Sequence, residues 1–203
     1  METFPRNIGW IEVICGPMFS GKTEELIRRL RRAVYARQTV EIYKPKVDTR
    51  YAAIEIVSHT KQSLQARPVG EAEEILELVD PEVDVVGIDE AQFFGEDLIE
   101  LCEELANRGL RVIVAGLDQD YTGAPFQPMP QLLAVAEYID KALAICVRCG
   151  NPANRSQRIA GGEAQVEVGA ADRYEARCRR CFDPGGVDGQ GDLWRAPPGD
   201  ADG

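Results

Sequence analysis

Residues 16–23 combine small and charged side chains in the order typical of a phosphate-binding loop. A glycine, four further residues and a second glycine precede a lysine and a threonine. The glycines let the backbone turn with its N–H groups facing inward, where they can bind phosphate oxygens, and the lysine can reach the outer phosphates. A glycine-rich turn without a ligand is the alternative. The residues predicted to bind nucleotide phosphates are Gly16, Pro17, Met18, Phe19, Ser20, Gly21, Lys22 and Thr23.

Two carboxylates follow an apolar run further along the chain. Residues 83–88 are rich in Val and Ile, as expected for a strand that is buried on both faces. Asp89 and Glu90 come directly after this run. In a phosphate-loop protein, one acid at this position binds the magnesium of the nucleotide, and a second acid can accept a proton. We assign Asp89 and Thr23 to the magnesium and Glu90 to the proton, and extend the nucleotide site to Asp89, Glu90, Ala91 and Gln92. A charged strand end in solvent is the alternative.

Four of the six cysteines form two pairs with the same spacing. Cys146 and Cys149 are separated by two residues, as are Cys178 and Cys181. This gap lets both sulfurs of a pair bind one tetrahedral zinc ion, although the 28 residues between the pairs exceed the usual ribbon spacing. A redox pair is the alternative, and two matched pairs favour zinc. Four thiolates leave no position for water, so the predicted zinc is structural.

An alternation of strands and helices positions these residues. We predict strands at residues 10–15, 40–43, 54–57, 83–88 and 111–117, and helices that begin near residue 22, at residue 71, near residue 98 and at residue 132. The apolar side chains of the first helix share one face, and its arginines take the other. This alternation predicts an α/β fold with a parallel sheet, helices on both faces and ligands beyond the carboxyl ends of the strands.

Length and composition restrict the class of protein. The 203 residues allow one domain with a small appendage: we predict a nucleotide-binding domain at 1–141, a zinc-binding lid at 142–182 and a disordered acidic tail at 183–203. The net charge of −11 argues against extended nucleic-acid binding. No apolar run is long enough to cross a membrane and no secretory signal is visible, so we expect a cytoplasmic protein. The single histidine, His59, lacks the partners of a catalytic triad and is interpreted as a loop residue.

Together these motifs resemble the zinc-containing (type II) thymidine kinase family over about residues 9–182. The phosphate loop alone would indicate only nucleotide binding. The resemblance rests on residues 16–23, 44–51 (Lys-Pro-Lys-Val-Asp-Thr-Arg-Tyr), 58–59 (Ser-His), 87–94 (Gly-Ile-Asp-Glu-Ala-Gln-Phe-Phe), 117–118 (Leu-Asp), 125–126 (Pro-Phe), 171–174 (Ala-Asp-Arg-Tyr) and the cysteine pairs.

The resemblance implies a P-loop (RecA-like) fold, a homotetramer and phosphate transfer from ATP, with magnesium, to thymidine. It also implies activity on deoxyuridine and feedback inhibition by dTTP. Glu90 matches the catalytic base and Arg50 an arginine on the phosphate side. The positions that match or extend the nucleoside pocket are Met18, Phe94, Leu117, Tyr121, Phe126, Ser156, Gln165, Val166, Glu167, Val168, Gly169, Ala170 and Tyr174. The resemblance further implies that residues 165–170 recognise the base through their backbone. Tyr121 stands where phenylalanine is common, and Thr60 and Ala170 also depart from the family pattern.

Two other functions fit parts of the pattern. A nucleic-acid-dependent ATPase would use the zinc module to bind the polymer, but residues 142–182 are not strongly basic. A zinc-stabilised nucleotide sensor would bind ATP and a nucleoside without forming ADP. Product analysis with ATP and a panel of nucleosides distinguishes the kinase, the ATPase and the sensor.

Overall fold

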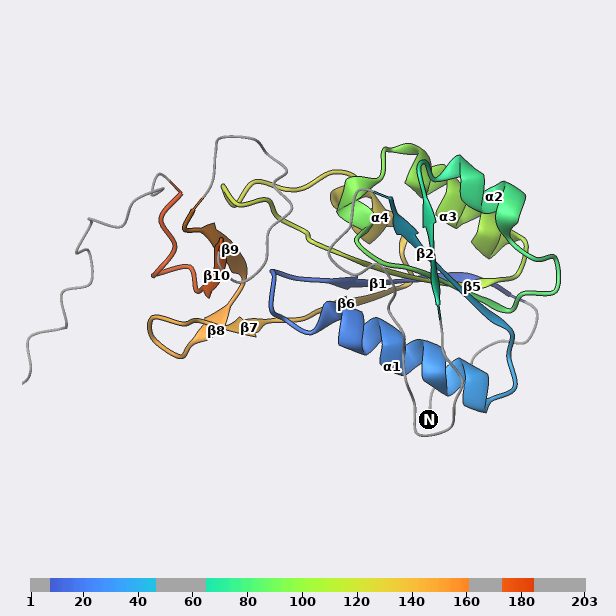
Figure 1. Ribbon diagram of the computed structural model, residues 1–203, viewed down its shortest axis with the longest axis horizontal. Helices are drawn as coiled ribbons and strands as arrows, with labels where there is room; N and C mark the ends of the chain where they lie inside the picture. Colours follow the sequence, from blue (N-terminus) through green and yellow to red (C-terminus); the bar gives the residue numbers. More distant parts are fainter. Residues whose placement is uncertain (1–7, 47–64, 161–172, 185–203) are drawn as a thin grey trace, which may run out of the picture.

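A six-stranded parallel β-sheet forms the centre of the computed structural model, which describes residues 8–46, 65–160 and 173–184 (Figure 1). From one edge to the other, the strands are β3 (Ala66–Val69), β2 (Val40–Pro45), β4 (Val85–Ile88), β5 (Arg111–Gly116), β1 (Trp10–Cys15) and β6 (Tyr138–Lys141). Every neighbouring pair is parallel. Their carboxyl ends therefore share one edge of the sheet, and the predicted phosphate loop and carboxylates follow β1 and β4 there.

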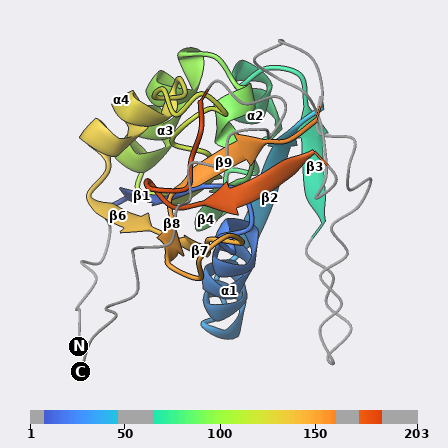
Figure 2. The same ribbon diagram turned by 90° about the vertical axis from the view of Figure 1, so that its left-hand side faces the viewer.

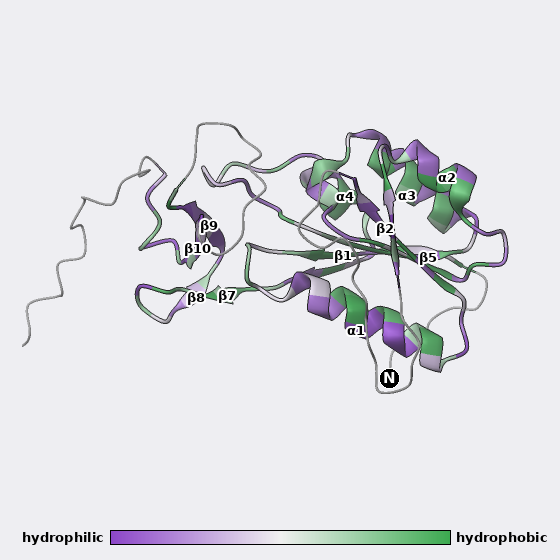
Figure 3. Cartoon of the chain, in the orientation of Figure 1, coloured by the Kyte–Doolittle hydropathy of each residue, from purple (hydrophilic) through white to green (hydrophobic). Residues whose placement is uncertain are grey.

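Helices cover both faces of this sheet, as the alternating pattern predicted (Figure 1). Helix α1 (Lys22–Tyr35) lies on one face, where Leu26 and Leu30 pack against Ile14 and Ile113. The other face is covered by α2 (Glu73–Leu78), α3 (Asp97–Asn107) and α4 (Met129–Val135). In Figure 3, α1 alternates between hydrophobic and hydrophilic bands, as a helix with one buried face must. The predicted α/β fold with a parallel sheet is confirmed.

The two edge strands, β3 and β6, were not predicted from the sequence. All four residues of β6 are exposed, so this strand lacks the buried apolar run that marks the central strands. Strand β3 contains Pro68, which interrupts the usual strand pattern. The predicted strand at 54–57 lies outside the described residues, as does His59. No helix in the described parts of the chain is long and apolar enough to span a membrane.

Four short strands follow the sheet and lie beside its carboxyl edge, at the left in Figure 1 and facing the viewer in Figure 2. We call the described residues 142–160 and 173–184 the cysteine module. Its first antiparallel pair is β7 (Ala144–Ile145) with β8 (Pro152–Ala153), and its second is β9 (Arg155–Arg158) with β10 (Tyr174–Arg177). Because these strands have only two to four residues, no hydrophobic period in the sequence could predict them.

Candidate active site

The phosphate loop joins β1 to the amino end of α1, as predicted. Gly16 has φ 145°, and a Cβ atom there would lie 2.2 Å from the carbonyl oxygen of Ala142, so only glycine fits. Gly21 precedes α1 in a left-handed conformation, with φ 81°. The loop therefore turns sharply into a helix amino end, which carries partial positive charge and favours a bound anion.

The two polar side chains that open α1 contact different parts of the site. The ammonium of Lys22 donates to the carbonyl oxygen of Pro17 at 2.7 Å. Burial lowers the pKa of Lys22, against the opposing charges of Glu90, Asp89 and Asp118. The Thr23 hydroxyl donates to Asp89, with oxygen distances of 3.0 and 3.3 Å. The structure thus brings together the threonine and the aspartate that we assigned to magnesium, 66 residues apart in sequence.

Asp89 is buried at the end of β4, and its environment disfavours a bare negative charge. Burial and the neighbouring charge of Glu90 raise the pKa of Asp89 to about 7, although hydrogen bonds from the Glu90 N–H and the Thr23 hydroxyl oppose this shift. A divalent cation would compensate the buried charge. Carboxylate and hydroxyl oxygens are the ligands that Mg²⁺ prefers, so Asp89 and Thr23 fit this ion.

The backbone conformation of Glu90 and a hydrogen bond from Gln92 fix the direction of the Glu90 side chain. Its φ of 52° and ψ of 42° lie in the left-handed region, directly before the short 3₁₀ turn η1 (Ala91–Phe93). The Gln92 amide donates to Glu90 Oε2 at 2.5 Å, and Gln92 Oε1 accepts from the N–H of Leu117 at 2.8 Å. Glu90 is therefore linked through one buried amide to the residue that follows β5.

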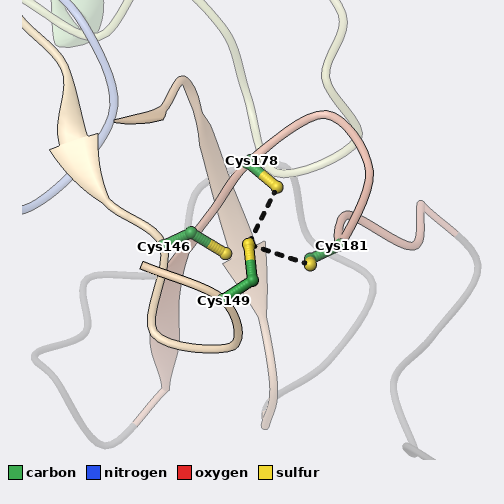
Figure 4. Close-up of side chains that lie close together, drawn as sticks. All are labelled: Cys146, Cys149, Cys178 and Cys181. Carbon is green, nitrogen blue, oxygen red and sulfur yellow. Dashed lines mark hydrogen bonds between the residues drawn. The ribbon is translucent and has the colours of Figure 1, made fainter. Parts of the chain in front are cut away.

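The four paired cysteines form one cluster in the cysteine module (Figure 4). The sulfur of Cys149 lies 3.6 Å from that of Cys178 and 3.5 Å from that of Cys181. All four sulfurs lie within 4.8 Å of one another. A tetrahedral zinc with bonds of about 2.3 Å holds its sulfurs about 3.8 Å apart, so the cluster could hold such an ion.

The backbone and side chain of Asn151 donate to Cys149 and lower the pKa of its thiol to about 6. Partial burial and hydrogen bonds with its neighbouring thiols raise the pKa of Cys181 to about 12. Four adjacent thiolates would repel one another without a cation, and a metal ion would favour ionisation of all four.

The family model for thymidine kinase matches residues 9–182. The chain belongs to the thymidine kinase family. A thymidine kinase from Rhodothermus sp. (strain ITI 518) is 63% identical over 178 residues, which cover 88% of this chain and 83% of the relative. The thymidine kinase of Bdellovibrio bacteriovorus is 56% identical, covering 87% and 86%, and that of Bacteroides thetaiotaomicron is 55% identical, covering 87% and 88%. The resemblance found in the sequence is confirmed.

One solved structure supports the fold alone. The flagellar accessory protein FlaH from Methanocaldococcus jannaschii superposes with a TM-score of 0.52 at 14% identity. The likeness covers 72% of this chain and 76% of that chain.

The residues assigned by family resemblance to the nucleoside pocket come from several elements around the carboxyl edge of the sheet. Phe94 follows η1 and Leu117 follows β5, while Tyr121 and Phe126 lie in the next loop. Phe94 and Phe126 are buried, and the ring of Phe126 meets that of Phe93 edge-on at 6.5 Å between centroids.

Two of the assigned residues belong to the cysteine module, and one of them contacts this edge directly. Ser156 Oγ accepts a hydrogen bond from the N–H of Met18 at 3.0 Å. Tyr174, on β10, contacts Arg158 of β9. Arg50 and residues Gln165, Val166, Glu167, Val168, Gly169 and Ala170, which the thymidine kinase resemblance also assigns, lie outside the described residues.

The sequence reasoning missed two charged groups near this edge. Asp118 is buried and pairs with Lys141 at 2.6 Å, while its second oxygen has no hydrogen-bond partner among the described residues. Arg158 is buried between Tyr121 and Tyr174. Asp118 belongs to the Leu-Asp motif at 117–118 that resembles the family. Its ion partner, Lys141, lies on β6, a strand that the sequence did not predict. Arg158 had no sequence signal, because a lone arginine in a polar segment is indistinguishable from a solvent-exposed one.

Proposed function

We propose that this protein transfers the γ-phosphate of ATP to the 5′-hydroxyl of thymidine or deoxyuridine, giving the nucleoside monophosphate and ADP. The observation that carries the proposal is the contact of Thr23 with Asp89, with Glu90 next in the chain. This contact supports a site in which a phosphate loop, an acid suited to magnesium and a second acid suited to proton transfer lie at one edge of the sheet. Relatives named thymidine kinase, 55–63% identical, support the choice of nucleoside.

In this proposal the phosphate loop and Lys22 bind the triphosphate, and Arg50 adds a positive charge on the phosphate side. Thr23 and Asp89 hold Mg²⁺, which when bound neutralises charge on the phosphate oxygens. Phosphoryl transfer depends mainly on positioning and on charge stabilisation, and these groups supply both. Lys22 is already turned toward the loop by its bond to the Pro17 carbonyl, which a phosphate oxygen would replace.

Glu90 then acts as the base. Its carboxylate accepts the proton of the nucleoside 5′-hydroxyl while the hydroxyl oxygen forms a bond to the γ-phosphorus, and the bond from phosphorus to the β–γ bridging oxygen breaks to release ADP. The bond from Gln92 orients this carboxylate, since it engages one of its two oxygens.

The base of the nucleoside would be recognised by residues 165–170 through backbone groups, with Met18, Phe94, Leu117, Tyr121, Phe126, Ser156 and Tyr174 around it. Thymine presents N3–H as a donor between two carbonyl acceptors, whereas cytosine presents N3 as an acceptor beside an amine. A backbone carbonyl that faces N3 would therefore pair with thymine or uracil and be left unpaired by cytosine, at a cost of about 1 to 3 kcal/mol.

Further proposals concern the metal and the assembly. We propose that Cys146, Cys149, Cys178 and Cys181 hold structural zinc, and that the domains divide at residues 141 and 182. Residues 185–203 of the predicted acidic tail lie outside the described residues. We also propose a cytoplasmic homotetramer that dTTP inhibits and that does not act on nucleic acid or membranes. The exposed apolar residues Ile139, Leu143 and Ile145, on and after the edge strand β6, support a contact between subunits.

A competition assay with ATP and equal thymidine and deoxycytidine tests the proposal. We expect thymidine and deoxyuridine to be phosphorylated, and deoxycytidine to be slower by about 10² to 10⁴ in kcat/KM, because two hydrogen-bond mismatches would be buried. Comparable formation of both monophosphates would contradict the assignment. ATP turnover that DNA stimulates and nucleosides leave unchanged would favour the ATPase, and binding without ADP formation would favour the sensor.

A further inference from the structure

Arg158 is the largest of the fully buried side chains in the described residues, and the proposed mechanism gives it no role. Only 1% of its surface is exposed. It ends strand β9, where it lies opposite Tyr174 of strand β10. Because a guanidinium stays charged at any physiological pH, its burial is costly unless its N–H donors find partners. The groups around Arg158 must therefore compensate for this cost.

Tyr174 provides one set of contacts, from within the cysteine module. Its hydroxyl accepts a hydrogen bond from Arg158 Nη2 at 2.8 Å and a second from Nε at 3.2 Å. Two adjacent donors of one planar group thus meet at a single oxygen. This geometry fixes the direction of the buried Tyr174 side chain relative to β9.

Tyr121 provides a contact from the other side, in the loop that follows β5. The central carbon of the Arg158 guanidinium lies 3.6 Å from the centroid of the Tyr121 ring, and 5.4 Å from that of Tyr174. The shorter distance is that of a planar cation stacked on an aromatic face, an attraction that desolvation strengthens. One guanidinium therefore joins an aromatic ring of the sheet domain to one of the cysteine module.

Other residues of β9 also contact the sheet domain. Ser156, two positions earlier and so on the same face of the strand, accepts the hydrogen bond from Met18 in the phosphate loop. Arg155, which lies on the other face of the strand, donates from Nη1 to the side chain of Gln119, in the same loop as Tyr121. Strand β9 thus contacts the active-site edge at three of its four residues.

We propose that Arg158 is a positioning residue for the nucleoside: it fixes Tyr121 and Tyr174, one from each domain, as facing parts of one pocket. The inference rests on the proposed function, which places both tyrosines around the nucleoside. Arginine is required because its planar guanidinium can stack on the ring of Tyr121 and also donate two hydrogen bonds to the hydroxyl of Tyr174. A lysine ammonium offers neither the plane nor the paired donors.

The first test is Arg158→Lys, which keeps the charge and removes the stacking plane and the paired donors. We expect KM for thymidine to rise roughly 10- to 100-fold, the range for losing hydrogen bonds to a charged group, with KM for ATP within about twofold. Zinc content should not change. Arg177→Lys is the matched control, because Arg177 is also a buried arginine of the module but pairs with Glu175 inside it. Its KM for thymidine should stay within about twofold.

A second variant, Tyr174→Phe, keeps the ring and the fold and removes the hydroxyl that Arg158 contacts. We expect it to raise KM for thymidine, and the double variant to raise KM by less than the product of the two single effects, because both remove the same bond. Multiplicative effects would overturn the inference.

Three other outcomes are decisive. Wild-type protein that does not phosphorylate thymidine would overturn the proposed function itself. Wild-type activity with an unchanged or lower thymidine KM in Arg158→Lys would overturn only the role of Arg158. An equal rise in both substrates' KM values would indicate general damage and would also overturn the positioning role.

Discussion

The conformation of Glu90 is set by the residues on either side of it in the chain. A non-glycine residue in the left-handed region costs about 1 to 3 kcal/mol, so its surroundings must hold it there. The Glu90 N–H donates to Asp89 Oδ1 at 2.9 Å, and the Gln92 amide holds the carboxylate. Asp89 and Glu90 are adjacent in sequence, yet one is buried beside Thr23 and the other is oriented by Gln92. This difference supports separate tasks for the two acids.

Replacing Glu90 with glutamine tests its task as the base. Glu90→Gln keeps the shape and still offers an oxygen to the Gln92 amide, but it cannot accept the proton of the 5′-hydroxyl. We expect kcat to fall by roughly 10² to 10⁴ with little change in ATP affinity, because only an interaction of the transition state is lost. Steady-state kinetics and ATP titration measure both quantities.

Lys22→Ala provides the comparison, since Lys22 is proposed to contact the triphosphate. It should weaken ATP binding or phosphate transfer directly. The assignment of Glu90 would be wrong if Glu90→Gln retained nearly full kcat with the chemical step shown to be rate-limiting.

The residues of this site divide into those that sequence could predict and those that it could not. The phosphate loop and the pair Asp89–Glu90 are contiguous motifs, so their positions could be read directly. Arg158 acquires its role only through Tyr121 and Tyr174, which lie 37 positions before it and 16 positions after it. Contacts between distant segments leave no local pattern, so its burial could not be foreseen.

At the scale of elements, one buried carboxylate joins three of them, and one of its arginine partners adds a fourth. Glu12 of β1 is 4% exposed, accepts a hydrogen bond from Arg111 of β5 at 2.6 Å, and pairs with Arg29 of α1 at 2.8 Å. Arg29 also pairs with Asp140 of β6 at 2.9 Å. Burial alone would raise the pKa of Glu12, but the hydrogen bonds from Arg111, Trp10 and Arg29 outweigh it and lower this pKa from its ordinary value.

This cluster predicts a pH-dependent contribution to stability. A carboxyl whose pKa is lowered by folding stabilises the protein above its ordinary pKa, and the stabilisation is lost as the pH falls through the lowered value. We expect Glu12→Gln to lower the free energy of unfolding by about 3 kcal/mol at pH 7, because the partly buried guanidinium groups of Arg29 and Arg111 lose the charge of the buried carboxylate that they share. The difference from wild type should shrink as the pH falls from the ordinary pKa of a glutamate toward the lowered pKa of Glu12, because Glu12 becomes protonated in the folded protein only at that lower pH. Denaturant titrations across this range measure it.

Glu25→Gln is the control for this variant. Glu25 also pairs with Arg29, but its side chain is 23% exposed and its other partner, Arg28, is 56% exposed. Pairs in contact with solvent contribute at most about 1 kcal/mol, so we expect a small change. Equal stability of Glu12→Gln and wild type at pH 7 would contradict the argument.

The elements that sequence predicted share a strong hydrophobic pattern. Strands β1, β4 and β5 are buried runs, and α1 has one apolar face. The missed strand β6 is held by its backbone pairing to β1 and carries exposed side chains, so its sequence resembles a loop. The strands of the cysteine module are too short to show a period of hydrophobic side chains. Only the spacing of its cysteines indicated a folded module in this part of the chain.

At the scale of the whole molecule, the cysteine module has little hydrophobic core of its own. Its buried apolar cluster consists of three alanines and two of the four cysteines, with the other two packed against them. The sheet domain instead has two clusters that cover both of its faces. Because so small an apolar cluster cannot offset the entropy lost on folding, we infer that bound metal is needed to hold β9 and β10 in place.

Replacing one cysteine of the cluster should therefore disturb the cysteine module and leave the stability of the sheet domain nearly unchanged. Cys178→Ser removes one sulfur of the cluster, so we expect loss of zinc and a higher KM for thymidine while the sheet domain melts near the wild-type temperature. Cys102→Ser is the matched control, because Cys102 is fully buried against the sheet, 0% exposed, and belongs to the other core. It should keep zinc and lower the melting temperature, since a hydroxyl replaces an apolar contact. Metal analysis, kinetics and thermal melting distinguish the two variants. Fewer than one zinc per two chains in reduced wild-type protein, or a Cys178→Ser variant that binds thymidine normally, would refute this role of the metal.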